Sequence, residues 1–209
     1  LEANELRPHD LAREVYQNAP TNAAYASTYA FSLLLLSKNA EALVWHGSGL
    51  YFHGGQAFQA GDNEKGMNLV QRGMGEMAKA VELEPNNVGV RIPRGAILLQ
   101  SSLFMPEGEF TNSVIRLGLD DYLTTLKVQE SRFESLGVHP RGELLQGIAG
   151  AYSRTGNQEQ AEKFYRRIAS ELKGTEYEKR ANKWLETKTL AVNESTCYGC
   201  HVAGAKAGQ

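Results

Sequence analysis

The amino-acid sequence predicts an all-α protein. Apolar residues recur at three- and four-residue intervals along most of the chain, which is the spacing of one helix face. The alternation of apolar and polar residues that is typical of strands is nearly absent. Clusters of Gly, Pro, Asn and Asp separate the periodic stretches, as turns between helices do. With 42% hydrophobic and 22% charged residues in 209, the composition is that of an ordinary globular protein.

The first half of the chain contains three stretches with helical periodicity. One spans about residues 25–36, the second about 40–60 and the third about 63–84. Gly66, Gly73 and Ala80 repeat at seven-residue spacing along the third stretch. Each glycine costs a helix about 1 kcal/mol. We therefore expect this row of small residues to pack closely against a neighbouring backbone.

The second half continues the helical pattern with shorter connections. We expect a helix from about Pro93 to Leu103, because proline is tolerated in a first turn, and then a loop over 105–108. A helix ending at Gly137 and a break at residues 139–140 precede three further helices over about 141–154, 157–172 and 175–190. The carboxylates at positions 120 and 121 are expected near a helix start, where they would stabilise the helix dipole.

Residues 145–165 resemble a tetratricopeptide repeat. Six residues fall at that family's spacing, and Gly156-Asn157 takes the place of its inner turn; the six are Ile148, Ala149, Tyr152, Gly156, Ala161 and Tyr165. Residues 26–42 match more weakly, and 80–87 resemble the close of such a repeat. The resemblance covers about half the chain. It implies a solenoid of helical hairpins over residues 1–190 with a concave face that binds partners; an up-down bundle is the rival architecture.

The periodic pattern stops at Ala191, and residues 191–209 form a small, polar tail. This tail contains both cysteines of the chain, in the sequence Cys197-Tyr198-Gly199-Cys200-His201. C-x-x-C-H is the attachment signature of haem c, and these five residues resemble those of c-type cytochromes. The resemblance implies that each thiol adds across one vinyl group of the porphyrin and that His201 is the proximal iron ligand. The sequence therefore predicts an irregular tail that binds one haem c.

Three other uses of the cysteines stay open. A structural zinc site needs four ligands, and since the chain has no second pair of cysteines, distant histidines would have to complete it. The two thiols could instead form a plain disulfide. Either case would make the protein a repeat-type adaptor without a redox function. A thioredoxin-like redox pair is a weaker alternative, because it requires a β-α-β setting.

The sixth position of the iron is the least defined part of the predicted site. Electron carriers fill it with His or Met, and the candidates are His9, His46, His53, His139, Met67, Met74, Met77 and Met105. The first three of these methionines share an apolar face and are expected in the core. His46 and His53 lie two helical turns apart, about 10.5 Å, so they cannot both bind one iron. Glycines beside them leave room for a flat ring, and we select His53 as the metal ligand.

One haem on a terminal tail suggests a repeating contact between copies. If the tail of one chain docks on the next, with His53 supplied by the neighbour, the contact is heterologous and builds an open filament. We expect electron transfer, with other copies and redox proteins as partners. A haem-based sensor or enzyme with an open axial site is the further alternative.

Other features limit the function and the location. No nucleotide-binding, hydrolase or metalloprotease motif occurs, so we expect no enzyme. A net charge of −2 argues against nucleic acid as a partner, and no apolar run approaches the ~20 residues of a membrane span.

The chain opens on Leu1 rather than Met, which we interpret as removal of a leader, although an arbitrary boundary would look the same. Because haem c matures outside the bacterial cytoplasm, the resemblance to cytochromes implies a periplasmic or extracellular protein.

Overall fold

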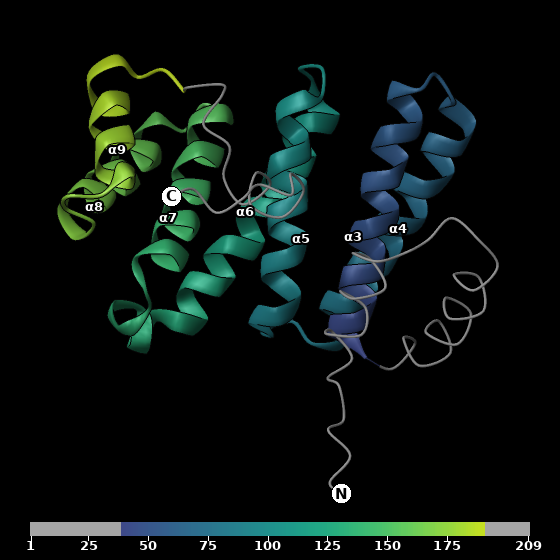
Figure 1. Cartoon of the computed structure of the whole chain (residues 1–209), viewed down its shortest axis with the longest axis horizontal. Coiled ribbons are helices and arrows are strands. Elements are labelled where there is room, and N and C mark those ends of the chain that lie inside the picture. Colours follow the sequence, from purple (N-terminus) through teal and green to yellow (C-terminus); the bar gives the residue numbers. More distant parts are fainter. Residues whose placement is uncertain (1–38, 191–209) are drawn as a thin grey trace, which may run out of the picture. The chain divides into compact units, whose positions relative to one another are not determined.

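The structure of the protein is a computed structural model that describes residues 39–190. In that range it contains seven α-helices and two short 3-10 helices and no strand, which confirms the all-α class for the described part (Figure 1). The chain divides into two compact units, with the boundary between Arg94 and Gly95, inside α5 (Val88–Ser101). The predicted helix over 25–36 and the tail 191–209 lie outside the described residues.

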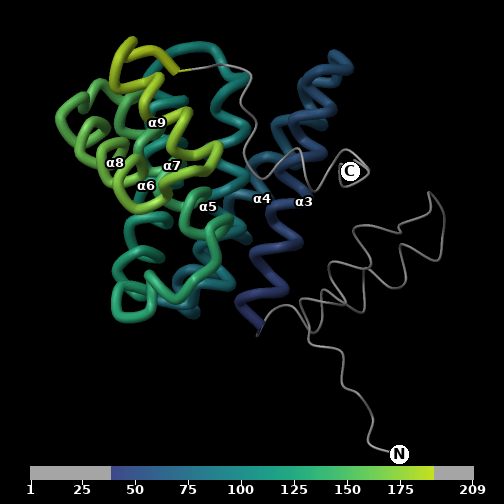
Figure 2. The backbone as a smooth tube through the Cα atoms, turned by 60° about the vertical axis from the view of Figure 1, so that its left-hand side comes forward, coloured from purple at the N-terminus to yellow at the C-terminus, as the bar shows by residue number. Residues whose placement is uncertain are grey.

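The first unit is built on a helical hairpin of α3 (Ala40–Gln59) and α4 (Asn63–Leu83), which lie side by side in Figures 1 and 2. Their bounds agree with the predicted 40–60 and 63–84. The side chain of Asn39 caps α3 by accepting a hydrogen bond from the Ala42 N–H (3.0 Å). Asp62 caps α4 in the same way through the Lys65 N–H (3.1 Å). Gly61 adopts φ +83° in the turn between them, a conformation that favours glycine.

Small residues let the two helices of the hairpin approach closely. A Cβ atom on Gly73 would lie 2.6 Å from the carbonyl oxygen of Gly47, and one on Gly47 would lie 2.8 Å from that of Gly73. Gly54 and Gly66 make a similar approach, seven residues after Gly47 on α3 and seven residues before Gly73 on α4. There a Cβ on Gly54 would lie 3.0 Å from the Gly66 oxygen. The row of small residues on α4 therefore packs against a neighbouring backbone, as the sequence predicts.

The second unit contains the rest of α5, η1 (Ser102–Phe104), α6 (Glu109–Gln129), η2 (Glu130–Ser135), α7 (Val138–Arg154), α8 (Gln158–Glu171) and α9 (Glu176–Thr187). Its core collects buried side chains from α6 to α9, among them Leu145, Ile148, Ile168 and Trp184. The ring of Trp184 stacks on Tyr165 with a centroid distance of 4.3 Å. The predicted loop over 105–108 and the predicted helices over 157–172 and 175–190 agree with these bounds.

The turn between α7 and α8 forms where the sequence predicts it. Gly156 has φ +81°, and Asn157 caps α8 by accepting a hydrogen bond from the Gln160 N–H (3.2 Å). Glycine is favoured at this position because other residues rarely adopt positive φ. The hairpin of α7 and α8 is thus set by a turn that the sequence encodes locally.

Two predicted helix starts are wrong, and both involve proline. Pro93 does not begin α5, which starts at Val88, where the side chain of Asn87 accepts a hydrogen bond from the Gly89 N–H (2.7 Å). The capping residue, not the proline, marks this start. Pro140 does not break the chain; it lies in the first turn of α7, where its missing N–H would have no partner in the helix.

The helix expected to end at Gly137 is also different. The α-helix α6 ends at Gln129, and the 3-10 helix η2 continues from Glu130 to Ser135. The side chain of Phe133 in η2 is buried. Since α6 begins at Glu109, Asp120 and Asp121 lie in its middle, and Asp121 is fully buried. The expectation that this pair stabilises a helix start is therefore wrong.

Candidate functional site

The predicted haem-attachment residues Cys197, Cys200 and His201 lie outside the described residues, as does His9. The described chain does show where the tail begins. Leu190 packs against the core of the second unit, with its Cδ2 4.0 Å from the position that a Cβ on Gly150 would occupy. The C-terminal segment therefore starts from a packed residue beside α7.

A cluster of charged surface residues just before Leu190 fixes the end of α9. Lys188 ends the helix in the left-handed conformation, with φ 54°. Its Nζ donates to Glu162 Oε2 (2.8 Å) and lies 4.7 Å from the centroid of the Trp184 ring. Arg166 also donates to Glu162, at 2.6 Å. Hydrogen bonds from Lys188 and then from Arg166 lower the pKa of the Glu162 carboxyl.

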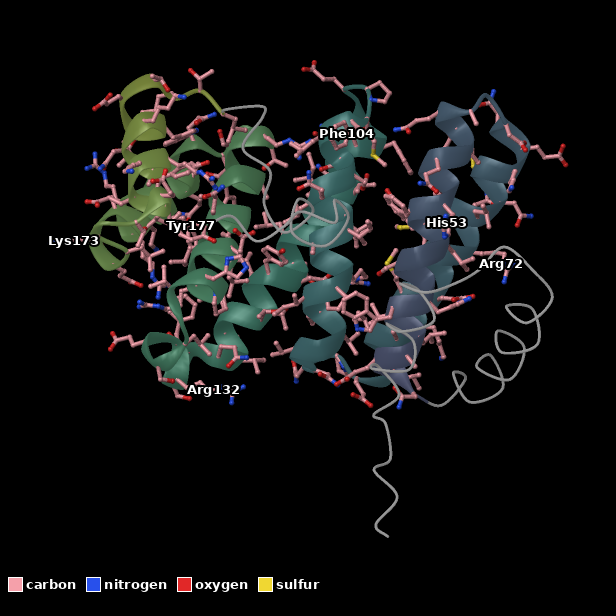
Figure 3. All side chains as sticks on the ribbon, viewed as in Figure 1. His53, Arg72, Phe104, Arg132, Lys173 and Tyr177 are labelled. Atoms are coloured by element: carbon pink, nitrogen blue, oxygen red, sulfur yellow. The ribbon has the colours of Figure 1, made fainter. Side chains whose placement is uncertain are left out.

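His53 lies on α3 with its side chain exposed (Figure 3). Its Nδ1 is 2.9 Å from Gln56 Oε1, one turn further along the helix. An amide oxygen only accepts, so Nδ1 is the donor and Nε2 has the lone pair in the neutral ring. The ring edge of His53 also meets Phe52, with a centroid distance of 5.9 Å. His53 therefore presents the chemistry of a ligand nitrogen on an exposed helix face.

His46 occupies a different environment on the same helix. Its side chain is only 12% exposed, and Nδ1 bonds to a carboxylate oxygen of Glu76 on α4. Its Nε2 atom is buried. A large ring could reach Nε2 only if the hairpin repacked, so among these two histidines the exposed His53 is the more accessible.

His139 is exposed at the start of α7, in the second unit. Its Nδ1 lies 2.9 Å from the hydroxyl of Tyr177, which donates to Glu143 Oε1 at 2.7 Å. Because that hydroxyl gives its own hydrogen to the carboxylate, it accepts one from Nδ1. His139 thus has an oriented ring with the lone pair on Nε2, and it is the second accessible histidine.

The methionines differ in their burial. Met77 is fully buried and its Sδ accepts a hydrogen bond from Ser48 Oγ (3.4 Å), as expected of a core residue. Met67, in contrast, is 50% exposed on α4. Met105 is half-buried in the loop between η1 and α6.

The sequence did not single out one feature of the second unit, a half-buried arginine, Arg154, that holds η1 in place. The Arg154 guanidinium donates to the Ser102 hydroxyl (2.7 Å) and carbonyl oxygen (2.6 Å), and reaches the Leu99 carbonyl oxygen at 3.4 Å. Burial lowers the pKa of Arg154. These carbonyls lie at the end of α5, where helix geometry leaves acceptors without intrahelical donors. A basic residue at a helix end has no sequence signature that reveals such a distant acceptor.

Three exposed apolar side chains follow Ser102 within eight residues of the sequence. Leu103 is 41%, Phe104 74% and Phe110 64% exposed, and we refer to these residues as the apolar platform. Phe104 lies at the end of α5 in Figure 3. Where exposed apolar side chains gather into a patch on a protein surface, the patch commonly marks a contact site.

The described residues by themselves do not form a metal centre. Between residues 39 and 190, no three His, Cys, Asp or Glu side chains lie together as metal ligands. In the same range, no helix combines the length and apolar character needed to cross a bilayer. Comparison with family models, curated proteins and solved structures finds no match to the chain.

Proposed function

We propose that the protein transfers single electrons through one c-type haem bound by the C-terminal tail. The observation that carries the proposal is the pentapeptide from Cys197 to His201, whose two thiols and imidazole are the donor set of haem c attachment. Each thiol adds its sulfur to one carbon of a vinyl group and its hydrogen to the other, so no oxidant or reductant is needed. The bound haem supplies a one-electron couple, and His201 ligates the iron from the proximal side.

The composition of the tail favours a large apolar group as its partner. Residues 191–209 contain few apolar side chains and many small ones, a composition that does not bury enough surface to fold alone. Covalent attachment lets a short segment hold a haem without a complete pocket. The anchored start of the tail at Leu190 limits where that haem can lie.

For the scaffold we propose a solenoid of tetratricopeptide-like hairpins. Two helices of the chain share the motif Pro-Arg-Gly, 47 residues apart, at Gly95 and Gly142. Each glycine faces a tyrosine ring, Tyr122 for Gly95 and Tyr177 for Gly142, where a Cβ would overlap ring atoms. Each contact joins a Pro-Arg-Gly helix to a tyrosine of a later helix, α5 to α6 and α7 to α9. This recurrence supports a repeated unit whose spacing is longer than the about 34 residues of a regular tetratricopeptide repeat.

We further propose that His53 supplies the sixth ligand from a neighbouring copy. Its exposure on α3 and its donor Nδ1 support this role, since ligand histidines typically hold their second nitrogen in a hydrogen bond. Such a contact between copies would propagate into a filament. Redox proteins would be the other partners, and the periplasm or the cell exterior is the location that haem c maturation favours.

Absorption spectroscopy of the chain, expressed with haem c maturation enzymes, tests the proposed function. Sharp α and β bands on reduction are expected for a six-coordinate haem c. A broad high-spin spectrum that shifts with carbon monoxide would instead indicate the sensor or enzyme with an open axial site. A colourless protein that binds zinc stoichiometrically, or holds a disulfide, would identify the adaptor and refute electron transfer.

A further inference from the structure

The apolar platform lies where the C-terminal tail can reach it. Seven residues lead from Leu190 to Cys197, and at about 3.5 Å per residue they span at most about 25 Å. Leu190 packs beside Gly150, which is one helical turn, about 6 Å, from Arg154 on α7. The Arg154 guanidinium in turn donates a hydrogen bond to the hydroxyl of Ser102 (2.7 Å), the residue directly before Leu103 of the platform.

The platform is held firmly despite its exposure. Ser102 is 1% exposed, and Arg154 binds both its hydroxyl and its carbonyl oxygen. Thr111, at the start of α6, donates to the Pro106 carbonyl oxygen at 2.6 Å and so fixes the loop that separates Phe104 from Phe110. A fixed surface with exposed aromatic side chains is a docking site that needs little ordering when it binds.

We infer that the apolar platform of Leu103, Phe104 and Phe110 is the docking surface for the C-terminal segment 191–209 and covers part of the apolar face of its haem. The inference rests on the proposed function, because it takes the haem as the group that the segment carries. The platform supplies two phenylalanine rings, whereas Tyr198 is the one Phe, Tyr or Trp residue in the sequence of the tail. Excluding water from one side of the haem would also raise its reduction potential, since solvent exposure and burial tune that potential.

The test uses the full-length holoprotein and two double variants. Phe104→Ser with Phe110→Ser removes the aromatic platform, and Val128→Ser with Val138→Ser removes two valines of the same unit that are 43% and 46% exposed. All four side chains lie largely on the surface, so the fold should persist, which far-ultraviolet circular dichroism checks. If the platform double variant does not fold, the single variant Phe104→Ser replaces it in the same comparison.

Two readouts report on the haem without depending on activity. We expect the platform variant to lose Soret-region circular dichroism and to shift to a lower reduction potential, while the valine control matches the wild type. Unchanged Soret dichroism and potential in the platform variant would overturn the inference. If light scattering shows that the platform variant only dissociates a wild-type dimer, the platform binds a second copy and the inference is also overturned. A wild-type protein without a Soret band would instead refute the proposed function itself.

Discussion

The glycine contact between α3 and α4 permits a sharp test of the hairpin. Alanine at Gly73 would place its Cβ 2.6 Å from the carbonyl oxygen of Gly47 and 2.7 Å from the backbone nitrogen of Tyr51. Both neighbours are backbone atoms, so relief requires the helices to separate rather than one side chain to rotate. Gly75, two residues away on α4, has no atom within 4 Å of the same position.

The two alanine variants isolate the cost of the overlap. Each gains about 1 kcal/mol of helix propensity, which cancels in the comparison. Overpacking in a close contact costs typically about 1–3 kcal/mol, and the backbone overlap at Gly73 belongs at the upper end of that range. We therefore expect Gly73→Ala to be less stable than Gly75→Ala by about 2–3 kcal/mol.

Urea unfolding followed by circular dichroism measures this difference. Gly47→Ala and Gly55→Ala repeat the comparison on α3, because Gly47 faces the contact and nothing lies within 4 Å of a Cβ on Gly55. In both pairs we expect the variant at the helix contact, Gly73→Ala or Gly47→Ala, to have the lower free energy of unfolding. If Gly73→Ala is as stable as Gly75→Ala, the close approach of the helices does not exist in solution and the packing described for the hairpin is wrong.

Three further predictions concern the second unit and the haem. Replacing Arg154 by Met removes its hydrogen bond to the carbonyl oxygen of Ser102 and should lower the free energy of unfolding by about 1–3 kcal/mol in urea titrations; an unchanged free energy of unfolding would contradict this role of Arg154. The folded-state pKa of Glu162 is lowered, so its interaction with Lys188 stabilises the protein at neutral pH and is lost as pH falls through that pKa. Glu162→Gln should therefore melt below the wild type at neutral pH and match it in acid, and a difference that persists in acid would refute the assignment. His53→Gln should convert a low-spin haem spectrum to a high-spin one, whereas a conversion caused by His139→Gln would move the sixth ligand to that residue.

The sequence was most informative where local chemistry sets the structure. The turn at Gly156 and the small-residue row through Gly66 and Gly73 both followed from residue type and spacing, because positive φ and close backbone approach demand glycine. The helix starts at Val88 and Val138 differ from the predicted ones because proline does not mark the boundary in either helix. In the first case Asn87 sets the start, and in the second proline fits the first turn.

Features that depend on distant residues could not be predicted in the same way. The bond from Arg154 to Ser102 joins residues 52 positions apart, and nothing in the periodicity of either segment indicates it. The hydrogen bond of Tyr177 to His139 likewise depends on how α7 and α9 meet. The attachment motif needs no tertiary context, which is why the sequence alone identifies Cys197, Cys200 and His201 as the predicted haem site.

The mass of the intact, denatured chain tests the central claim most directly. Haem bound through two thioethers survives denaturation, so the wild-type protein should carry the added mass of one haem. The variant with both Cys197 and Cys200 changed to Ala should show the mass of the polypeptide alone. A wild-type chain without this added mass, after expression with active haem c maturation enzymes, would contradict the proposed covalent haem.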